Sequence, residues 1–263
     1  MSQPFALACR GGLNVNLNQL EIMRQPGLAT ELLNFEVDPD GGYRRINGFT
    51  LFGGDSSARP NSSNRILGLA VYADGLIACS GTGIFFSQDG TSWLQINKAS
   101  VSASGDNFST FSGRSNDARS SQGQCSFALF EGTTDYGEML ICDGANKPFF
   151  FKMTGTGALS DRTFFAGEIT VDSTTAPTVG VIHENHFVVG GAPTAKNKIF
   201  FSATLDPESF SGTGSGSIQL TDAIVGLASF RSDLIIFCKN SIFKLINISD
   251  SSNIAIVPIT QNV

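Results

Sequence analysis

The chain has 263 residues, and its 17 Lys and Arg against 23 Asp and Glu give a net charge of −6 with only 15% of the chain charged. This acidic balance argues against a protein that grips nucleic acid over a broad face, although it leaves room for nucleic acid to slide past. Every apolar run is broken by Gly, Ser or a charge before it reaches the ~18 residues of a membrane-spanning helix, so no membrane partner is expected.

The beginning of the sequence is expected to form an N-terminal arm and docking segment over residues 1–60, followed by a separate β domain over residues 61–263. Within the arm, apolar residues keep rough helical spacing after Pro26, so one short helix is predicted over residues 26–35. The sequence Asp-Pro-Asp-Gly-Gly follows at residues 38–42. It predicts a reverse turn rather than a calcium loop, because the later carboxylate ligand of such a loop is missing.

Short runs of β-branched and aromatic residues alternate with Gly, Asn, Asp and Ser in the rest of the chain, a pattern typical of many short antiparallel strands. These runs group into four repeats of three strands, and the first and last repeats align strand for strand. The predicted strands are residues 66–72, 76–79 and 84–87; 125–130, 138–142 and 148–152; 179–182, 186–190 and 199–202; and 224–230, 234–238 and 242–245.

The spacing of the repeats indicates the fold. Their last strands start 65, 50 and 43 residues apart, at Ile84, Phe149, Ile199 and Ile242. Periods of ~40 to 50 residues with three or four strands each are typical of propeller blades. We therefore predict an all-β protein with β-propeller-like repeats of short antiparallel strands, about four blades and an extended N-terminal arm. Stretches such as residues 92–97 and 217–220 are expected to add a fourth, outer strand to a blade.

Three of the five cysteines, Cys79, Cys142 and Cys238, fall at the end of the middle strand of a repeat, which predicts small buried packing positions rather than redox centres. No CxxC pair is present, and no secretory signal is recognisable in residues 1–10, so we expect a chain made in the cytoplasm with reduced thiols. Residues 254–260 show one more strand pattern. Because four blades are the fewest of the usual range, we expect that the propeller is incomplete or that other chains complete the sheet.

Few residues form a pattern that could carry chemistry. Residues 87–93 resemble a shortened Asp-box, a structural hairpin of sialidase-type propellers in which the Asp caps backbone donors. His183 and His186 are three residues apart across a predicted turn, whereas a zinc-binding helix needs them four apart, so both are expected to be surface residues of that turn. No catalytic residue, metal site or cofactor is predicted.

The N-terminal arm carries a resemblance to a known family. Residues 11–14, 27–36 and 41–49, the last reading Gly-Gly-Tyr-Arg-Arg-Ile-Asn-Gly-Phe, resemble the opening of the packaged-DNA stabilisation or tail nozzle proteins of tailed bacteriophages. In that family a Gly-Gly-Leu arm and a Gly-Gly-Tyr-Arg-Arg strand precede propeller blades. Residues 199–202 with 206–210 are similar to the family's recurrent blade ending.

The resemblance implies a non-enzymatic structural protein of the virion tail or neck, made in the host cytoplasm and assembled in several copies around the tail axis. Its implied partners are copies of itself and other tail, neck or portal-proximal proteins, with DNA at most passing through an acidic lumen. The residues expected to form contacts lie in the arm and are Gly11, Gly12, Leu13, Asn34, Phe35, Tyr43, Arg44 and Arg45.

Two other functions remain open from the sequence. One is a receptor- or glycan-binding propeller at a tail tip, which would use aromatic loop residues such as Trp93 and Phe108. The other is a sialidase-like hydrolase, for which the sequence offers neither an arginine cluster nor a convincing pair of carboxylates.

Overall fold

The computed structural model describes residues 12–14, 16–25, 27–29, 31, 33–38, 42–48, 60, 65–81, 83–96, 123–132, 136–158, 161–172, 175–250 and 253–261. The chain divides into two compact units, Met1–Leu51 and Phe52–Val263. The border predicted after residue 60 differs from this one over a stretch that, apart from Pro60, lies outside the described residues, so the exact border stays a prediction.

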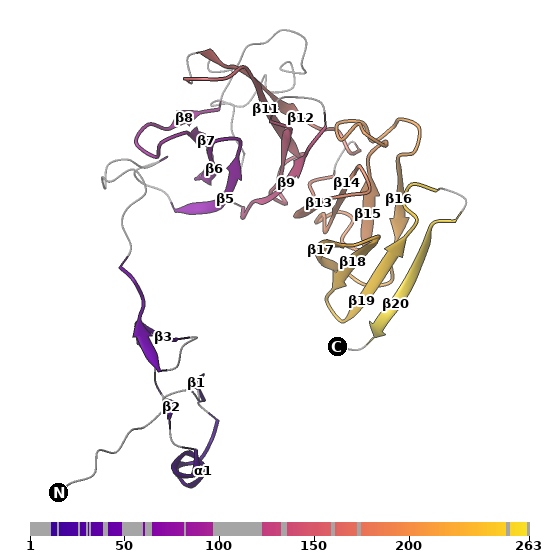
Figure 1. Cartoon of the computed structure of the whole chain (residues 1–263). Helices are drawn as coiled ribbons and strands as arrows, with labels where there is room; N and C mark the ends of the chain where they lie inside the picture. Colours follow the sequence, from indigo (N-terminus) through magenta and orange to yellow (C-terminus); the bar gives the residue numbers. More distant parts are fainter. Residues whose placement is uncertain are drawn as a thin grey trace, which may run out of the picture. The chain divides into compact units, whose positions relative to one another are not determined.

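In its described residues, the first unit contains four very short strands and one helix (Figure 1). Strand β1 (Gly12–Leu13) pairs in parallel with β2 (Leu28–Ala29). Strand β3 (Phe35–Val37) pairs antiparallel with β4 (Tyr43–Arg45), and the N–H of Asp38 donates to the carbonyl of Gly42 between them. Strands β3 and β4 therefore form a hairpin, and the reverse turn predicted at residues 38–42 stays a prediction because residues 39–41 lie outside the described part.

The helix predicted over residues 26–35 is wrong, because helix α1 spans Gln19–Arg24. Its start is fixed by Asn18, whose side chain accepts from the N–H of Glu21 while the Glu21 carboxylate accepts from the N–H of Asn18. Such a reciprocal capping box satisfies two donors that a helix start otherwise leaves unpaired. Gln25 has left the helical conformation, as expected for a residue before proline.

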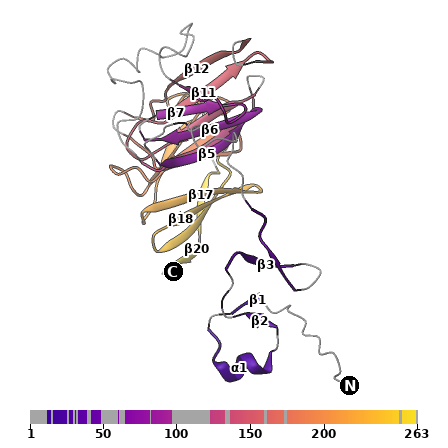
Figure 2. The ribbon, with the colours of Figure 1, turned by 90° about the vertical axis from the view of Figure 1, so that its left-hand side faces the viewer.

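The described residues of the second unit form four antiparallel sheets, each with four strands in chain order (Figures 1 and 2). We number these sheets as blades 1 to 4. Blade 1 comprises β5 (Ile66–Tyr72), β6 (Gly75–Ser80), β7 (Gly83–Ser87) and β8 (Leu94–Gln95). Blade 2 comprises β9 (Ser126–Phe130), β10 (Glu138–Cys142), β11 (Phe149–Thr154) and β12 (Thr163–Glu168). Blade 3 comprises β13 (Val179–His183), β14 (His186–Gly190), β15 (Lys198–Phe201) and β16 (Gly216–Gln219). Blade 4 comprises β17 (Ile224–Phe230), β18 (Asp233–Cys238), β19 (Ser241–Ile246) and β20 (Ala255–Gln261).

Two-residue turns connect the first two strands of blades 1, 3 and 4. In blade 3 the turn residues Glu184 and Asn185 both have positive φ, which matches the two-residue hairpin turn whose twist suits antiparallel strands. Blades 1 and 4 also share an irregularity, because the register shifts between Ile66 and Gly68 in one and between Ile224 and Gly226 in the other. The strand-for-strand alignment of the first and last repeats is thereby confirmed down to a bulge.

Three apolar clusters hold successive blades together. The first lies between blades 1 and 2 and includes Tyr72, Phe86 and Phe151; the second lies between blades 2 and 3, and the third between blades 3 and 4. Blades 2 and 3 are therefore covered by a neighbouring blade on both faces. Four meandering sheets that pack face to face in this way form an all-β, propeller-like fold, as the sequence predicts.

The strand predictions hold, with one addition. Strand β8 lies within the predicted outer stretch 92–97 and β16 overlaps the predicted stretch 217–220, whereas β12 is an outer strand that the sequence analysis did not identify. The strand pattern predicted at residues 254–260 is confirmed as β20, which pairs with β19 as the outer strand of blade 4. No helix in the described part of the chain is long and apolar enough to cross a membrane.

Candidate functional site

The predicted contact residues of the arm fall on its two small sheets. Gly12 and Leu13 form β1, and the Leu13 side chain is 53% exposed. Asn34 and Phe35 stand at the start of the β3–β4 hairpin, where Asn34 has a φ of 60° and accepts from the N–H of Ile46. Gly11 lies outside the described residues.

The three side chains of the strand Tyr43-Arg44-Arg45 make different interactions. The hydroxyl of Tyr43 donates to the carbonyl of Gly27 at 2.7 Å and so ties the hairpin to the segment after α1. Arg44 forms an exposed ion pair with Glu36 across the two strands, its Nε 2.7 Å from Oε1. Arg45 is exposed at the edge of a hollow of about 470 Å³ that Asn34 also lines. The structure thus brings Asn34 and Arg45 together, and it gives Tyr43 a structural role.

The arm also has an apolar surface that the sequence analysis did not predict. None of the described apolar side chains of residues 1–51 is buried, and Leu20 and Met23 of α1 are 73% and 79% exposed. The signal that could have found them is the pair Asn18 and Glu21, which marks a helix start in the sequence. The exposed apolar side chains, which we call the arm surface, are Leu13, Leu20, Met23, Leu33, Phe35 and Ile46.

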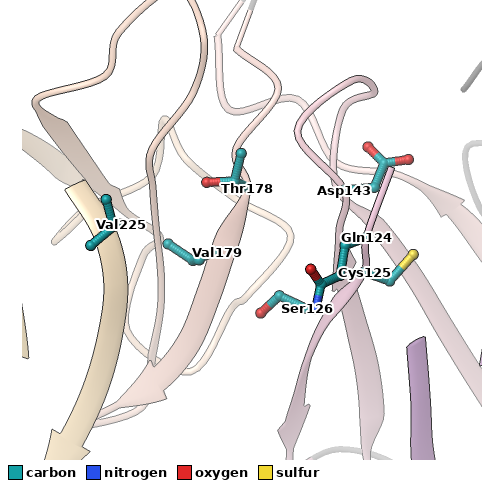
Figure 3. A pocket seen from close by; sticks show the side chains of 7 residues that line it. All are labelled: Gln124, Cys125, Ser126, Asp143, Thr178, Val179 and Val225. Atoms are coloured by element: carbon teal, nitrogen blue, oxygen red, sulfur yellow. The ribbon is translucent and has the colours of Figure 1, made fainter. Parts of the chain in front are cut away.

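A pocket of about 400 Å³ lies where the inner strands of blades 2, 3 and 4 meet (Figure 3). Figure 3 shows residues 124–126 on one strand, Thr178 and Val179 on the next and Val225 on the third. The carboxylate of Asp143 at its rim accepts from the N–H groups of Ala145 and Asn146, and the Thr178 hydroxyl donates to the carbonyl of Gly191. These polar groups hold the connections between strands and blades in place.

The prediction that both histidines lie on the surface is wrong, because His183 and His186 are 2% and 0% exposed. His186 Nδ1 lies 2.7 Å from the carbonyl oxygen of Ser202. A carbonyl only accepts, so Nδ1 carries the proton, and in the neutral ring Nε2 accepts from the hydroxyls of Thr204 and Ser249, each 3.3 Å away. The hairpin belongs to blade 3, and the rest of that blade and the neighbouring blade 4 pack over it, which is why its side chains are buried.

His183 faces blade 4, with Nδ1 2.9 Å from the hydroxyl of Ser229 on β17. Its Nε2 is buried without a hydrogen-bond partner among the described residues. Burial lowers the pKa of His183, and the nearby carboxylates of Glu184 and Asp233 oppose that shift only in part. Among the described residues, no group of three or more His, Cys, Asp or Glu is placed to hold a metal ion.

The Asp-box prediction is confirmed at the level of the turn. Asp89 Oδ1 accepts from the N–H groups of Thr91 and Ser92, and Ser87 Oγ accepts from the N–H of Gly90. Hydrogen bonding by the Thr91 side chain and by these backbone groups lowers the pKa of Asp89 to about 2. Trp93 is half-buried, and Phe108, the second aromatic residue of the glycan-binding alternative, lies outside the described residues.

The prediction that three cysteines occupy small buried packing positions is confirmed. Cys79, Cys142 and Cys238 are buried, each in one of the three clusters between blades, although Cys79 aligns with Phe237 and not with Cys238. Burial raises the pKa of the Cys142 thiol well above its ordinary value. A thiol with a raised pKa carries little thiolate, which suits a packing position.

An ion pair that the sequence did not reveal links blades 1 and 2. The guanidinium of Arg162, between β11 and β12, binds both carboxylate oxygens of Asp74 in the β5–β6 turn at 2.6 and 2.7 Å. Arg162 also donates to the carbonyl of Gly157. The guanidinium of Arg162 holds the pKa of Asp74 well below its usual range.

No model of a known protein family matches the sequence, and no curated protein matches it. Among solved structures, the WD40 domain of Pan2 from Neurospora crassa has a TM-score of 0.44 and 10% identity, covering 75% of this chain and 52% of its own. AztD from Citrobacter koseri has a TM-score of 0.45 and 11% identity, and the match covers 74% of this chain and 46% of AztD. YCF48 from Cyanidioschyzon merolae has a TM-score of 0.43 and 11% identity, and the match covers 84% of this chain and 64% of YCF48.

The chain therefore spans less than two thirds of the length of these three structures. Similarities of this size carry no function over to this chain, and the fold is established by the strands and packing described above. Together with the exposed arm surface, that fold defines the chain as a β-propeller module with an appended N-terminal unit.

Proposed function

We propose that the chain is a non-enzymatic structural subunit of a bacteriophage tail or neck, of the nozzle or packaged-DNA stabilisation type. In this proposal it is made in the host cytoplasm and built into the virion in several copies around the tail axis. Its partners are copies of itself and neighbouring tail, neck or portal-proximal proteins, and DNA at most passes by. The proposal includes neither a cofactor nor a membrane.

The arm surface is the observation that carries this proposal. The first unit has a capped helix and two paired sheets, yet every described apolar side chain in it stays at least partly exposed. Fully burying a side chain such as Leu20 or Met23 stabilises a complex by about 1.5–3 kcal/mol. A unit in which every described apolar side chain is at least partly exposed suits an interaction site, which is what a docking arm requires.

The residues of the family resemblance add support, because they coincide with the arm's secondary structure. The Gly-Gly-Tyr-Arg-Arg segment includes β4, in which Tyr43 fixes the hairpin and leaves Arg45 exposed. An arm with paired strands, exposed apolar residues and exposed guanidinium groups suits a contact with another protein better than catalysis.

Virions produced from a phage genome that carries this gene test the proposal. An antibody against the chain should label the tail or neck in electron micrographs of the wild type. A double variant, Leu20→Ser with Met23→Ser, should be depleted from purified particles at least about tenfold, because the arm loses apolar contact area. The matched control, Leu205→Ser, changes a similarly exposed leucine of the propeller and should be incorporated normally. Virions that never contain the chain would overturn the proposal.

A further inference from the structure

The face of blade 4 that points away from blade 3 is apolar. Along β18 the side chains alternate: Leu234 and Ile236 are fully buried against blade 3, while Ile235 and Phe237 lie on the other face. A sheet with one face in water normally carries polar residues there. Phe237 is instead 40% exposed. We call this side of β17, β18 and β19 the blade-4 face.

Blade 1 shows what such a face is built for, because it aligns with blade 4 and is covered by blade 2. Five apolar positions of the blade-4 face have apolar counterparts that are buried in blade 1. Val225 and Phe230 are 60% and 59% exposed, whereas their counterparts in blade 1, Leu67 and Tyr72, are 8% and 0% exposed. The aligned pairs are Leu67 and Val225, Tyr72 and Phe230, Ile77 and Ile235, Cys79 and Phe237, and Ile84 and Ile242.

The blade-4 face carries an ion pair, and the guanidinium of Arg231 lies over the Phe230 ring, 5.3 Å from its centroid. Lys244, which aligns with the buried Phe86 of blade 1, pairs with Asp233 of the neighbouring strand at 3.2 Å. The two charges already neutralise each other on the surface, so another sheet could cover them without burying an unpaired charge.

Blade 1 offers an open strip at the other end of the series. Leu69 and Val71 of β5 are 56% and 71% exposed, and their neighbours Ala70 and Tyr72 pack toward blade 2. The Leu69 and Val71 side chains therefore point away from blade 2. Ala78 and Phe85 on the same side are already buried, so the open part is a strip along β5, which we call the blade-1 strip.

The contacts between inner strands identify the occupant. Successive inner strands touch in chain order, β5 with β9, β9 with β13 and β13 with β17. The next contact in this series would join β17 to a strand such as β5, and a second copy of the chain supplies one with an open apolar strip. We infer that the blade-4 face of one copy packs on the blade-1 strip of a second copy.

Two copies joined twice in this way form a closed, two-fold symmetric ring of eight blades, which lies within the usual propeller range of four to eight. The inference deepens the proposed function, because it names the surfaces through which copies join, and it rests on that function only for the assembly of several copies. It does not depend on the virion setting.

Single-face variants of the full chain test the inference. Sedimentation of the wild type over a range of concentrations should reveal a dimer. Val71→Asp on the blade-1 strip and Phe230→Asp on the blade-4 face should each raise the dissociation constant at least about tenfold, because each places a charge in the apolar contact. Leu205→Asp, with 60% exposure away from both surfaces, is the matched control and should behave as the wild type. Phe237→Ser provides a second variant of the blade-4 face, should Phe230→Asp fail to fold.

A mixture of the two variants distinguishes the head-to-tail contact from other contacts. Val71→Asp mixed with Phe230→Asp should recover dimers, because each mixed pair keeps one interface that is wild-type on both sides. A contact between two blade-4 faces would instead be lost in Phe230→Asp and kept in Val71→Asp. That result would overturn the inference. So would a wild type that stays monomeric, or a dimer whose dissociation constant neither variant changes. Virion labelling is measured independently, so the inference and the proposed function can fail separately.

Discussion

At the scale of single residues, the hairpin that ends in His183 and His186 shows how much a neighbouring blade changes a side chain's chemistry. His186 has partners at both ring nitrogens, whereas His183 has one hydrogen bond and a buried, unpartnered Nε2. Protonation of His183 would place a second N–H, and a charge, where the described residues provide no acceptor. The neutral form is therefore favoured in the folded state.

This environment predicts an acid-sensitive contribution to stability. The pKa of His183 is lowered on folding, so its contribution is present above the ordinary value of about 6.5 and is lost as the pH falls through the folded-state pKa. We expect His183→Gln to reduce the change in the free energy of unfolding between pH 7 and pH 5. Urea unfolding at both pH values measures it. The carboxylates are common to both proteins, so identical pH dependence of variant and wild type would contradict the assignment to His183.

At the scale of strands and turns, close packing between blades 2 and 3 leaves no room at Gly180 of β13. A Cβ there would lie 2.7 Å from the Phe187 ring and 3.0 Å from the sulfur of Cys142. At Gly226 of β17, by contrast, the nearest atoms lie 3.7 Å away, at ordinary contact distance. Both glycines belong to inner strands, so the two positions form a matched pair.

We expect Gly180→Ala to lower the free energy of unfolding by about 1–3 kcal/mol, because overpacking forces neighbouring side chains from their preferred positions. Gly226→Ala should change it by less than about 0.5 kcal/mol. Chemical denaturation of both variants provides the measurement. Equal losses would show that the contact between blades 2 and 3 relaxes more easily than its geometry implies.

The sequence predicts the strands well because each blade repeats one simple pattern of apolar runs and turn residues. It fails where the decisive interaction is local and small or comes from another blade. The first case is α1, which depends on the capping pair Asn18 and Glu21 rather than on apolar spacing. The second is the burial of His183 and His186, to which blade 4 contributes through Ser229 and Ser249 and to which residues of blade 3 that are distant in sequence contribute through Ser202 and Thr204.

The candidate site was predictable in place but not in detail. The motif around Tyr43 correctly drew attention to the arm, yet Tyr43 and Arg44 proved to be engaged within it, and Leu20 and Met23 provide much of the exposed surface. Exposure depends on what lies around a side chain in three dimensions. A single sequence does not show which side chains of the arm lack a packing neighbour.

At the scale of the whole molecule, the two middle blades are covered on both faces, whereas blades 1 and 4 at the ends of the series each have a face that no other blade in the described part of the chain covers. Blades 2 and 3 are covered on both faces, and blade 4 on one. We expect the backbone amides of β10 and β14 to exchange hydrogen at least about tenfold more slowly than those of β18 in dilute solution. Hydrogen exchange with mass spectrometry measures this order. Protection of β18 equal to that of β10 at the lowest concentration would contradict it.

The outer strand of blade 4 contains a proline, which limits how this blade can grow. Pro258 pairs with Phe243 of β19, and β20 is the edge of its sheet. Proline is tolerated in an edge strand when the missing N–H would have pointed outward, which removes a donor that an added strand would need. Extension of this sheet into a fibril by strand addition is thereby discouraged. The exposed apolar residues of blade 4 can therefore face a partner while its edge resists uncontrolled aggregation.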